Sequence, residues 1–175
     1  MSAAGLVVRR AAADDAAPLA TFAERCFREA YGPLNEPADV EQHVARHYGA
    51  ERQAADLASP ELRILLALEG GGLVGFAVLA PGSAHPDVAV RHPCEIRRFY
   101  VDGSRHGRGV AGALMAAAAV EAGASGCEAL WLTTWEHSHR ARAFYAKQGF
   151  TDIGTTSFLL GSTPQTDRLL VRRLE

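Results

Sequence analysis

The sequence predicts a single α/β domain in which a central, mixed and mostly antiparallel sheet is flanked by helices. Three observations support this fold class. The chain has 175 residues, enough for one domain with a sizeable core. Hydrophobic residues make up 48% and charged residues 22% of it, the balance of an ordinary globular protein. In the second half, strand-like and helix-like segments alternate along the chain, which favours a mixed α/β sheet.

The N-terminal part predicts a strand followed by two helices. Residues 6–9 form a short apolar strand, and the stretch 11–15 provides an N-cap region before the first helix. The apolar positions of this helix fall on one face: Leu19, Phe22, Ala23, Cys26, Phe27 and Ala30. Gly32 and Pro33 end it. Residues 35–37 begin a second helix, whose apolar positions are Val40, Val44 and Tyr48.

Three strands are predicted next. Residues 63–68 and 74–79 are apolar runs joined by a glycine-rich turn at 69–72, which predicts a hairpin because glycine tolerates positive φ angles. Residues 81–93, with three prolines, form a loop. The third strand covers residues 95–101. Its alternation places Glu95, Arg97, Phe99 and Val101 on one face and Ile96, Arg98 and Tyr100 on the other.

The remaining elements follow a glycine-bearing turn at residues 102–108. A helix of small residues is predicted over 109–123, with one apolar stripe formed by Val110, Ala113, Leu114, Ala117 and Val120. Four further elements are predicted: a strand at 129–134, a helix at 138–148 that Gly149 ends, and closing strands at 151–159 and 168–174 around a turn at 161–167.

Composition and charge exclude several classes of function. A net charge of −2 and a pI near 6.4 argue against a nucleic-acid partner, which usually needs clustered excess Lys and Arg. Cys26, Cys94 and Cys127 lack C-x-x-C spacing, so they predict reduced core thiols rather than a disulfide framework or a zinc site. Residues 1–15 lack the apolar run of a signal peptide, and no segment approaches the ~18 apolar residues of a membrane span. We therefore expect a soluble, cytoplasmic protein with no membrane partner.

A glycine-rich loop, RHGRGVAG at residues 105–112, predicts an anion-binding site. Its small residues let main-chain N–H groups approach a phosphate where a helix begins. Gly107, Gly109 and Gly112 match G-x-G-x-x-G, but a dinucleotide fingerprint places its first glycine almost directly after the strand, whereas residues 102–106 intervene here. No Gly-Lys-Ser/Thr follows, which disfavours a nucleotide P-loop. Tight helix packing is the alternative explanation of these glycines.

The loop resembles the pyrophosphate-binding motif of the GNAT N-acetyltransferase superfamily, roughly Gln/Arg-x-x-Gly-x-Gly/Ala after a strand that ends in a Tyr-Val-like pair. Residues 99–101 fill the strand end, Gly109 and Ala111 fill the later positions, and His106 stands where Gln or Arg is usual. The resemblance implies a GNAT-like fold with splayed central strands and acetyl-CoA as co-substrate. The cofactor-binding residues that it implies are Phe99, Tyr100, Val101, His106, Gly107, Arg108, Gly109, Val110, Ala111, Gly112 and Ser138.

A second block, residues 138–150, agrees with the first. It resembles the superfamily pattern Asn-x-x-Ala-x-x-Phe-Tyr-x-x-x-Gly-Phe, with Tyr145 at the tyrosine position and Ser138 where Asn is frequent. A serine there can cap a helix or hydrogen-bond a cofactor. Over nearly its whole length the chain resembles the PaiA-like polyamine acetyltransferases, in segments 27–37, 95–101, 134–150 and 158–167.

The PaiA-like resemblance implies a small-molecule amine as acceptor, with spermidine and spermine as the leading candidates. It also suggests that Tyr31 and Asn35 line the acceptor site, with a simple helix-connecting turn as the alternative. Trp135 is a further candidate for the edge of this site, with packing as the alternative. An aminoglycoside, an amino acid or a protein N-terminus stays open as acceptor. A non-catalytic acyl-CoA-binding sensor is a further alternative. The resemblance to the superfamily also suggests a homodimer.

Direct acetyl transfer needs two proton-transfer groups, because an ammonium group cannot attack a thioester and CoA leaves as a thiolate. The resemblance puts Tyr145 at the position of the acid; a packed aromatic is the alternative. Glu95 is the candidate base, directly or through water; an exposed side chain or one paired with Arg97 is the alternative. His137 and His139 have no clear third ligand, so no metal site is predicted.

Overall fold

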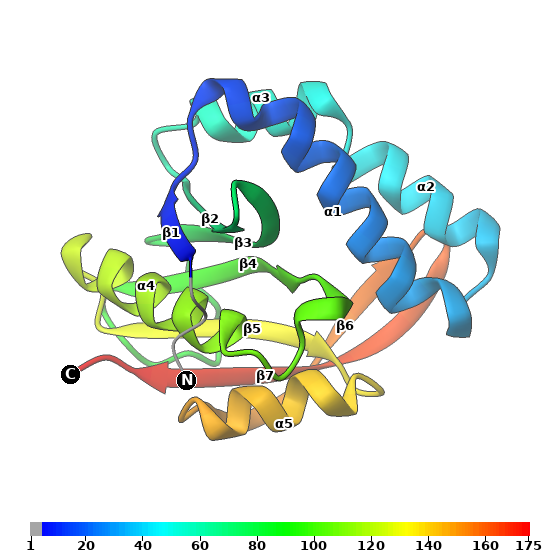
Figure 1. The fold of residues 1–175 in the computed structure, drawn as a ribbon. Coiled ribbons are helices and arrows are strands. Elements are labelled where there is room, and N and C mark those ends of the chain that lie inside the picture. The colour runs from blue at the N-terminus through cyan, green and yellow to red at the C-terminus, as the bar shows by residue number, and fades with distance from the viewer. Residues whose placement is uncertain (1–4) are drawn as a thin grey trace.

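The computed structural model describes residues 5–175 (Figure 1). Residues 1–4, the beginning of the segment searched for a signal peptide, lie outside the described residues. The strands are β1 (Leu6–Arg10), β2 (Arg63–Glu69), β3 (Gly72–Pro81), β4 (Pro93–Val101), β5 (Ala129–Trp135), β6 (Thr151–Leu160) and β7 (Thr163–Arg173). The α-helices are α1 (Ala16–Tyr31), α2 (Pro37–His47), α3 (Ala50–Ala58), α4 (Val110–Ala124) and α5 (His139–Lys147).

All seven strands form one sheet in the order β1-β2-β3-β4-β5-β7-β6. Every neighbouring pair is antiparallel except β4 and β5, which run parallel. The β2–β3 hairpin turns through Gly70 and Gly71, whose φ angles of +58° and +81° are those that favour glycine. The predicted mixed, mostly antiparallel sheet and its glycine hairpin are therefore confirmed.

Helices cover both faces of the sheet (Figure 1). Helices α1, α2 and α3 lie over one face, which we call the α1 face. Helices α4 and α5 lie over the other, which we call the α4 face. Phe27 and Phe76 are buried in the core on the α1 face, and Leu114 and Leu132 in the core on the α4 face. Membership of one core or the other shows to which face each strand residue points.

The structure has three helices before the hairpin, whereas the sequence pattern predicts two. The additional helix, α3, has no aliphatic stripe: the residues that it buries are Gln53 and Asp56. Asp56 accepts hydrogen bonds from Arg98 of β4 at 2.9 Å and from Arg52 at 3.1 Å. An ion pair thus ties α3 to the sheet, and hydrophobic periodicity gives no sign of such a helix.

The predicted stripe of α4 is wrong at one end. Val110 and Leu114 are buried as predicted, but Val120 is 73% exposed. Nearly every residue of α4 is small or apolar, so the period of the pattern alone does not identify the buried face. Packing against β2 and β3 decides it, and the other buried residues are Met115, Ala118 and Ala122.

Strand β7 begins at Thr163, inside the segment predicted as a turn, so the turn between β6 and β7 contains only Gly161 and Ser162. Pro164 lacks an N–H group, but β7 pairs only with β6 at that point, because its pairing with β5 starts at Asp167. The prediction of a turn over 161–167 is therefore wrong. The correction moves Asp167 from a turn into the sheet.

A bulge in β4 reverses the predicted faces of its first half. Ile96 and Arg98 each pair with a residue of β3, whereas Arg97 between them has no partner. Ile96 consequently packs in the same core as Phe99, on the α4 face. Glu95 points to the α1 face, so the prediction that it shares a face with Phe99 is wrong.

Strands β4 and β5 separate along most of their length. Only three residue pairs join them, and the last is Glu95 with Trp131, although β4 continues to Val101 and β5 to Trp135. Beyond Glu95, the backbone groups of the two strands that face each other have no ladder partner. The predicted splay of the central strands is confirmed.

Candidate active site

The glycine-rich loop joins the end of β4 to the start of α4. Gly107 and Gly109 have φ angles of +75° and +85°, a region that glycine reaches without strain. Helix α4 begins at Val110, so the N–H groups of residues 110–112 have no intrahelical carbonyl to bind. A Cβ atom added to Gly112 would meet no atom within 4 Å. Helix packing is therefore not what requires glycine at this position, and the space over the first turn is open.

Asp102 fixes the beginning of the loop. Its Oδ1 atom accepts a hydrogen bond from the Ser104 backbone N–H at 2.9 Å, and its Oδ2 atom accepts one from Arg25 of α1 at 2.8 Å. Hydrogen bonds from the Ser104 hydroxyl and from Arg25 lower the pKa of the Asp102 carboxyl to about 2. The carboxylate therefore ties the loop to α1 throughout the physiological pH range.

The side chains of the loop are engaged to different degrees. The Nε2 atom of His106 lies 3.1 Å from the carbonyl oxygen of Val101, so this ring is bonded to the end of β4. Arg108 is exposed and forms no ion pair within residues 5–175. Free N–H groups, open space over Gly112 and an uncommitted guanidinium together fit a pyrophosphate. The contacts of the individual residues with acetyl-CoA stay predictions.

The end of β4 presents aromatic rings to both faces. The ring of Phe99 lies 5.7 Å from that of Phe144 and 6.1 Å from that of Tyr145, both on α5. Tyr100 points to the α1 face, where its ring lies 5.7 Å from that of Phe76. These residues belong to the splayed part of β4, so each face of the sheet has an aromatic wall beside the separation of the strands.

Tyr145 is buried on the α4 face, with 7% of its surface exposed. Its ring makes edge contacts with Phe99, Phe144 and Phe150. Burial raises the pKa of its phenol well above the ordinary value of 10.0. The side chain is thus both a packed aromatic and a phenol that keeps its proton at neutral pH, as a proton donor must. Its role as the acid stays a prediction.

Glu95 lies on the α1 face, at the last residue pair before β4 and β5 separate. Its Oε2 atom accepts a hydrogen bond from the Ser83 hydroxyl at 2.7 Å and one from the Arg97 Nε atom at 3.1 Å. The salt-bridged alternative is therefore present in the structure. Glu95 and Tyr145 lie on opposite faces of the sheet.

The three predicted acceptor residues are close to one another. Tyr31 and Trp135 stack with their ring centroids 5.6 Å apart and their planes at 26°. The side-chain amide of Asn35 donates a hydrogen bond to the Tyr31 carbonyl at 2.7 Å, and its Oδ1 atom accepts one from Gln165. The turn after α1, the end of β5 and the start of β7 therefore meet at this point.

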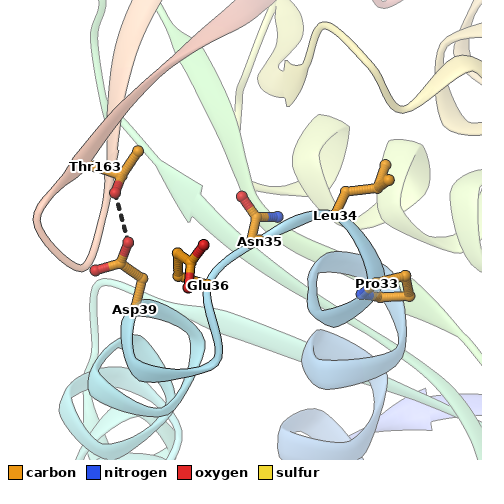
Figure 2. A pocket seen from close by; sticks show the side chains of 6 residues that line it. All are labelled: Pro33, Leu34, Asn35, Glu36, Asp39 and Thr163. Carbon is orange, nitrogen blue, oxygen red and sulfur yellow. Dashed lines mark hydrogen bonds between the residues drawn. The ribbon is translucent and has the colours of Figure 1, made fainter.

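Asn35 also lines a polar hollow of about 400 Å³ beside the turn between α1 and α2, shown in Figure 2. Asp39 anchors one wall, because its carboxylate accepts hydrogen bonds from Ser162 and Thr163 at the β6–β7 turn. Glu36 adds a second carboxylate. The hollow is distinct from the loop and from Tyr145, neither of which lines it.

Sequence reasoning missed Asp167, which lies on β7 opposite Trp135 of β5. Only 4% of its surface is exposed, and its Oδ1 atom is buried without a hydrogen-bond partner in the described chain. Burial raises the pKa of its carboxyl to about 6; the nearby Thr133 hydroxyl lowers this pKa, and the charge of Glu136 raises it. The mistaken prediction of a turn at 161–167 placed this residue outside the sheet. A carboxylate in a turn is ordinary, so the sequence offered no reason to consider it a site residue.

The other candidate residues have simpler surroundings. Ser138 occupies the N-cap position of α5, but its hydroxyl makes no capping hydrogen bond. The rings of His137 and His139 lie 6.5 Å apart, and residues 5–175 contain no group of three side chains that could hold a metal ion. The three cysteines are buried. No helix in the described part of the chain has the length and apolar character needed to cross a membrane.

Comparisons with known proteins agree with this arrangement. The sequence profile described as "Acetyltransferase (GNAT) family" matches residues 20–150. A protein of Mycobacterium tuberculosis named an uncharacterized N-acetyltransferase is 35% identical over 160 residues, covering 91% of this chain and 98% of that protein.

Two solved structures have a similar fold. The PaiA N-acetyltransferase from Thermoplasma acidophilum, solved in complex with coenzyme A, gives a TM-score of 0.79 at 17% identity, with 96% of this chain and 98% of that chain covered. A GCN5-related N-acetyltransferase from Rhodopseudomonas palustris gives a TM-score of 0.77 at 22% identity, with 99% of both chains covered.

Proposed function

The chain belongs to the acetyltransferase (GNAT) family, and from this premise we propose that it transfers the acetyl group of acetyl-CoA directly to a primary amine of a polyamine such as spermidine or spermine. As a member of the family it is an acetyl-CoA-dependent N-acetyltransferase. The positions of the candidate groups on the two faces of the sheet support our assignment of the site. A donor-rich loop and a protonated phenol lie on one face of the splayed strands, and carboxylates lie on the other.

Each part of the chain has one task in this proposal. Acetyl-CoA supplies the acyl group as a thioester. The first-turn N–H groups of α4, with Arg108, hold the pyrophosphate, and the unpaired backbone of β4 beyond Glu95 bonds the pantetheine amides. Tyr145 donates its proton to the departing sulfur. Glu95 and the Ser83 hydroxyl bonded to it offer a route by which water carries a proton away from the amine.

The choice of a polyamine rests on charge. Glu136 and Asp167 lie at the end of β5, and Glu95 lies on the α1 face opposite Trp131 of the same strand. The hollow lined by Asn35 adds Glu36 and Asp39. A chain with several ammonium groups suits carboxylates spread along such a path.

An amine panel tests the proposal. Release of CoA thiol from acetyl-CoA is measured with spermidine, spermine, an aminoglycoside, free amino acids and a peptide with a free N-terminus. We expect the highest kcat/KM with spermidine or spermine. A clear preference for another amine would support the acetyltransferase activity and contradict the assignment of a polyamine as the acceptor. Binding of acetyl-CoA without turnover on any amine would favour a sensor and contradict the proposed catalysis.

A further inference from the structure

We propose that Asp167 is the carboxylate that binds the ammonium group of the acceptor and takes its proton before acetyl transfer. This inference rests on the proposed function and assigns the amine end of the same site, where it gives Asp167 instead of Glu95 the role of base.

Asp167 is a buried carboxylate without a cation of its own. It is 4% exposed, one of its oxygens has no hydrogen-bond partner in residues 5–175, and it takes part in none of the ion pairs found there. Its neighbour on β7, Arg168, pairs instead with Asp152 at 2.7 Å. A buried carboxylate costs free energy unless a cation or hydrogen-bond donors compensate it. The ammonium group of a bound amine provides a positive charge and hydrogen-bond donors.

The surroundings of Asp167 lead toward the separation of the strands. In the β5–β7 register, Thr133 and Trp135 lie on the same face as Asp167. Thr133 is exposed although both its neighbours on β5 are buried, so this face is open beside Asp167. The stacked rings of Trp135 and Tyr31 form an aromatic surface next to the carboxylate, which suits an ammonium group.

Burial raises the pKa of the Tyr31 phenol, and the negative charge of Asp167 raises it further. Tyr31 is therefore neutral at physiological pH and does not compensate the charge of Asp167. The ionisable groups that interact with Asp167 are Tyr31 and Glu136.

Glu95 is less suited to bind the ammonium group. Its Oε2 atom already accepts hydrogen bonds from the Arg97 guanidinium and from Ser83. A second cation would have to compete with the first. Asp167 has no such competitor, because it takes part in no ion pair within residues 5–175.

The protons balance in this scheme. Asp167 takes one proton from the ammonium group and becomes a carboxylic acid. The free amine forms the new C–N bond to the acetyl carbonyl carbon while the C–S bond breaks. Tyr145 gives its proton to the sulfur and recovers one from the acylated nitrogen, and Asp167 later releases its proton to water.

Calorimetry with spermidine tests the inference, because Asp167→Asn keeps the shape of the side chain and removes its charge. We expect at least a tenfold loss of spermidine affinity, at least a hundredfold loss of kcat/KM, and an affinity for CoA within about twofold of wild type. At pH 6, titrations in two buffers of different ionisation enthalpy should show that wild type releases about half a proton on binding spermidine, and that the variant releases none.

Asp152→Asn is the matched control, since it removes an exposed carboxylate from the adjacent strand β6 and should leave spermidine affinity unchanged. Thr133→Val provides a second variant should Asp167→Asn not fold. A several-fold loss of spermidine affinity is expected because it replaces an exposed hydroxyl on the same face as Asp167 by a methyl group, which disfavours the ionised carboxylate. Normal spermidine binding and turnover in Asp167→Asn, or an equal loss in Asp152→Asn, would overturn the role of Asp167 alone. A wild-type protein that binds CoA but not spermidine would contradict the polyamine proposal as well.

Discussion

The cofactor half and the acceptor half of the candidate site are built differently. The cofactor half is one continuous segment, in which a strand end, two left-handed glycines and a helix start present backbone donors. The acceptor half is assembled from side chains of α1, β5 and β7, held by the Tyr31–Trp135 stack and the Asn35–Gln165 hydrogen bond. Backbone recognition is therefore encoded locally, whereas side-chain recognition depends on which distant segments the fold brings together.

The largest effect should come from Tyr145, the candidate proton donor. Tyr145→Phe removes one hydroxyl and keeps the ring contacts with Phe99 and Phe150. We expect turnover to fall by about a hundredfold or more, because the sulfur would leave without a proton donor. Acetyl-CoA affinity, measured by calorimetry, should stay within about twofold, since the backbone donors are untouched. Wild-type turnover in this variant would remove Tyr145 from the mechanism and leave it as a packed aromatic.

A smaller effect should separate binding from stability within α4. In Gly112→Ala the new methyl group meets no atom within 4 Å apart from the backbone of its own helix, and it enters the open space over the first turn. We expect acetyl-CoA to bind about tenfold more weakly, while the free energy of unfolding rises by up to about 1 kcal/mol because alanine favours the helix.

Gly123→Ala is the control, since Gly123 lies in the last turn of the same helix and an added Cβ there also meets no atom within 4 Å. It should give the same gain in the free energy of unfolding without any loss of acetyl-CoA affinity. Equal acetyl-CoA affinity in the two variants would mean that the space over Gly112 is solvent and not part of the cofactor site.

The same contrast explains what could be predicted from the sequence. The hairpin at Gly70 and Gly71 and the loop before α4 follow from glycines whose conformation is a local property. Helix α3 could not be predicted in this way, because an ion pair with Arg98 of β4 holds it. The β4 bulge could not be predicted either, because only the pairing with β3 shows that Arg97 is the extra residue. Asp167 was missed for the same reason, since its burial depends on β5 and α1.

A third prediction concerns the stability cost of the acceptor half. The pKa of the Asp167 carboxyl is about 6 in the folded protein, above the ordinary value of 3.8, so the folded state holds this proton more tightly between these values. The free energy of unfolding should therefore fall as pH rises from about 4 to about 6 and stay lower above that range.

Asp167→Asn should remove this fall. At pH 8 we expect the variant to be more stable than wild type by about 1 kcal/mol, a modest gain because the exposure of Thr133 keeps water near the carboxylate. Urea unfolding at pH 4 and pH 8 measures it, with Asp152→Asn as reference. A variant that is less stable than wild type at pH 8 would show that Asp167 holds the fold together, contrary to our interpretation.

The smallest effect is expected at His106, where the chain departs from the superfamily motif. Its ring is bonded to the Val101 carbonyl at the end of β4, and the phosphate donors of the loop are backbone groups. His106→Gln should therefore change acetyl-CoA affinity by less than about threefold, whereas Arg108→Ala, which removes an uncommitted cation, should weaken it more and reduce its dependence on salt. If His106→Gln instead tightened acetyl-CoA binding tenfold, the side chain at position 106 would take part in cofactor recognition. The cofactor half would then use side chains as well as backbone groups, as the acceptor half does.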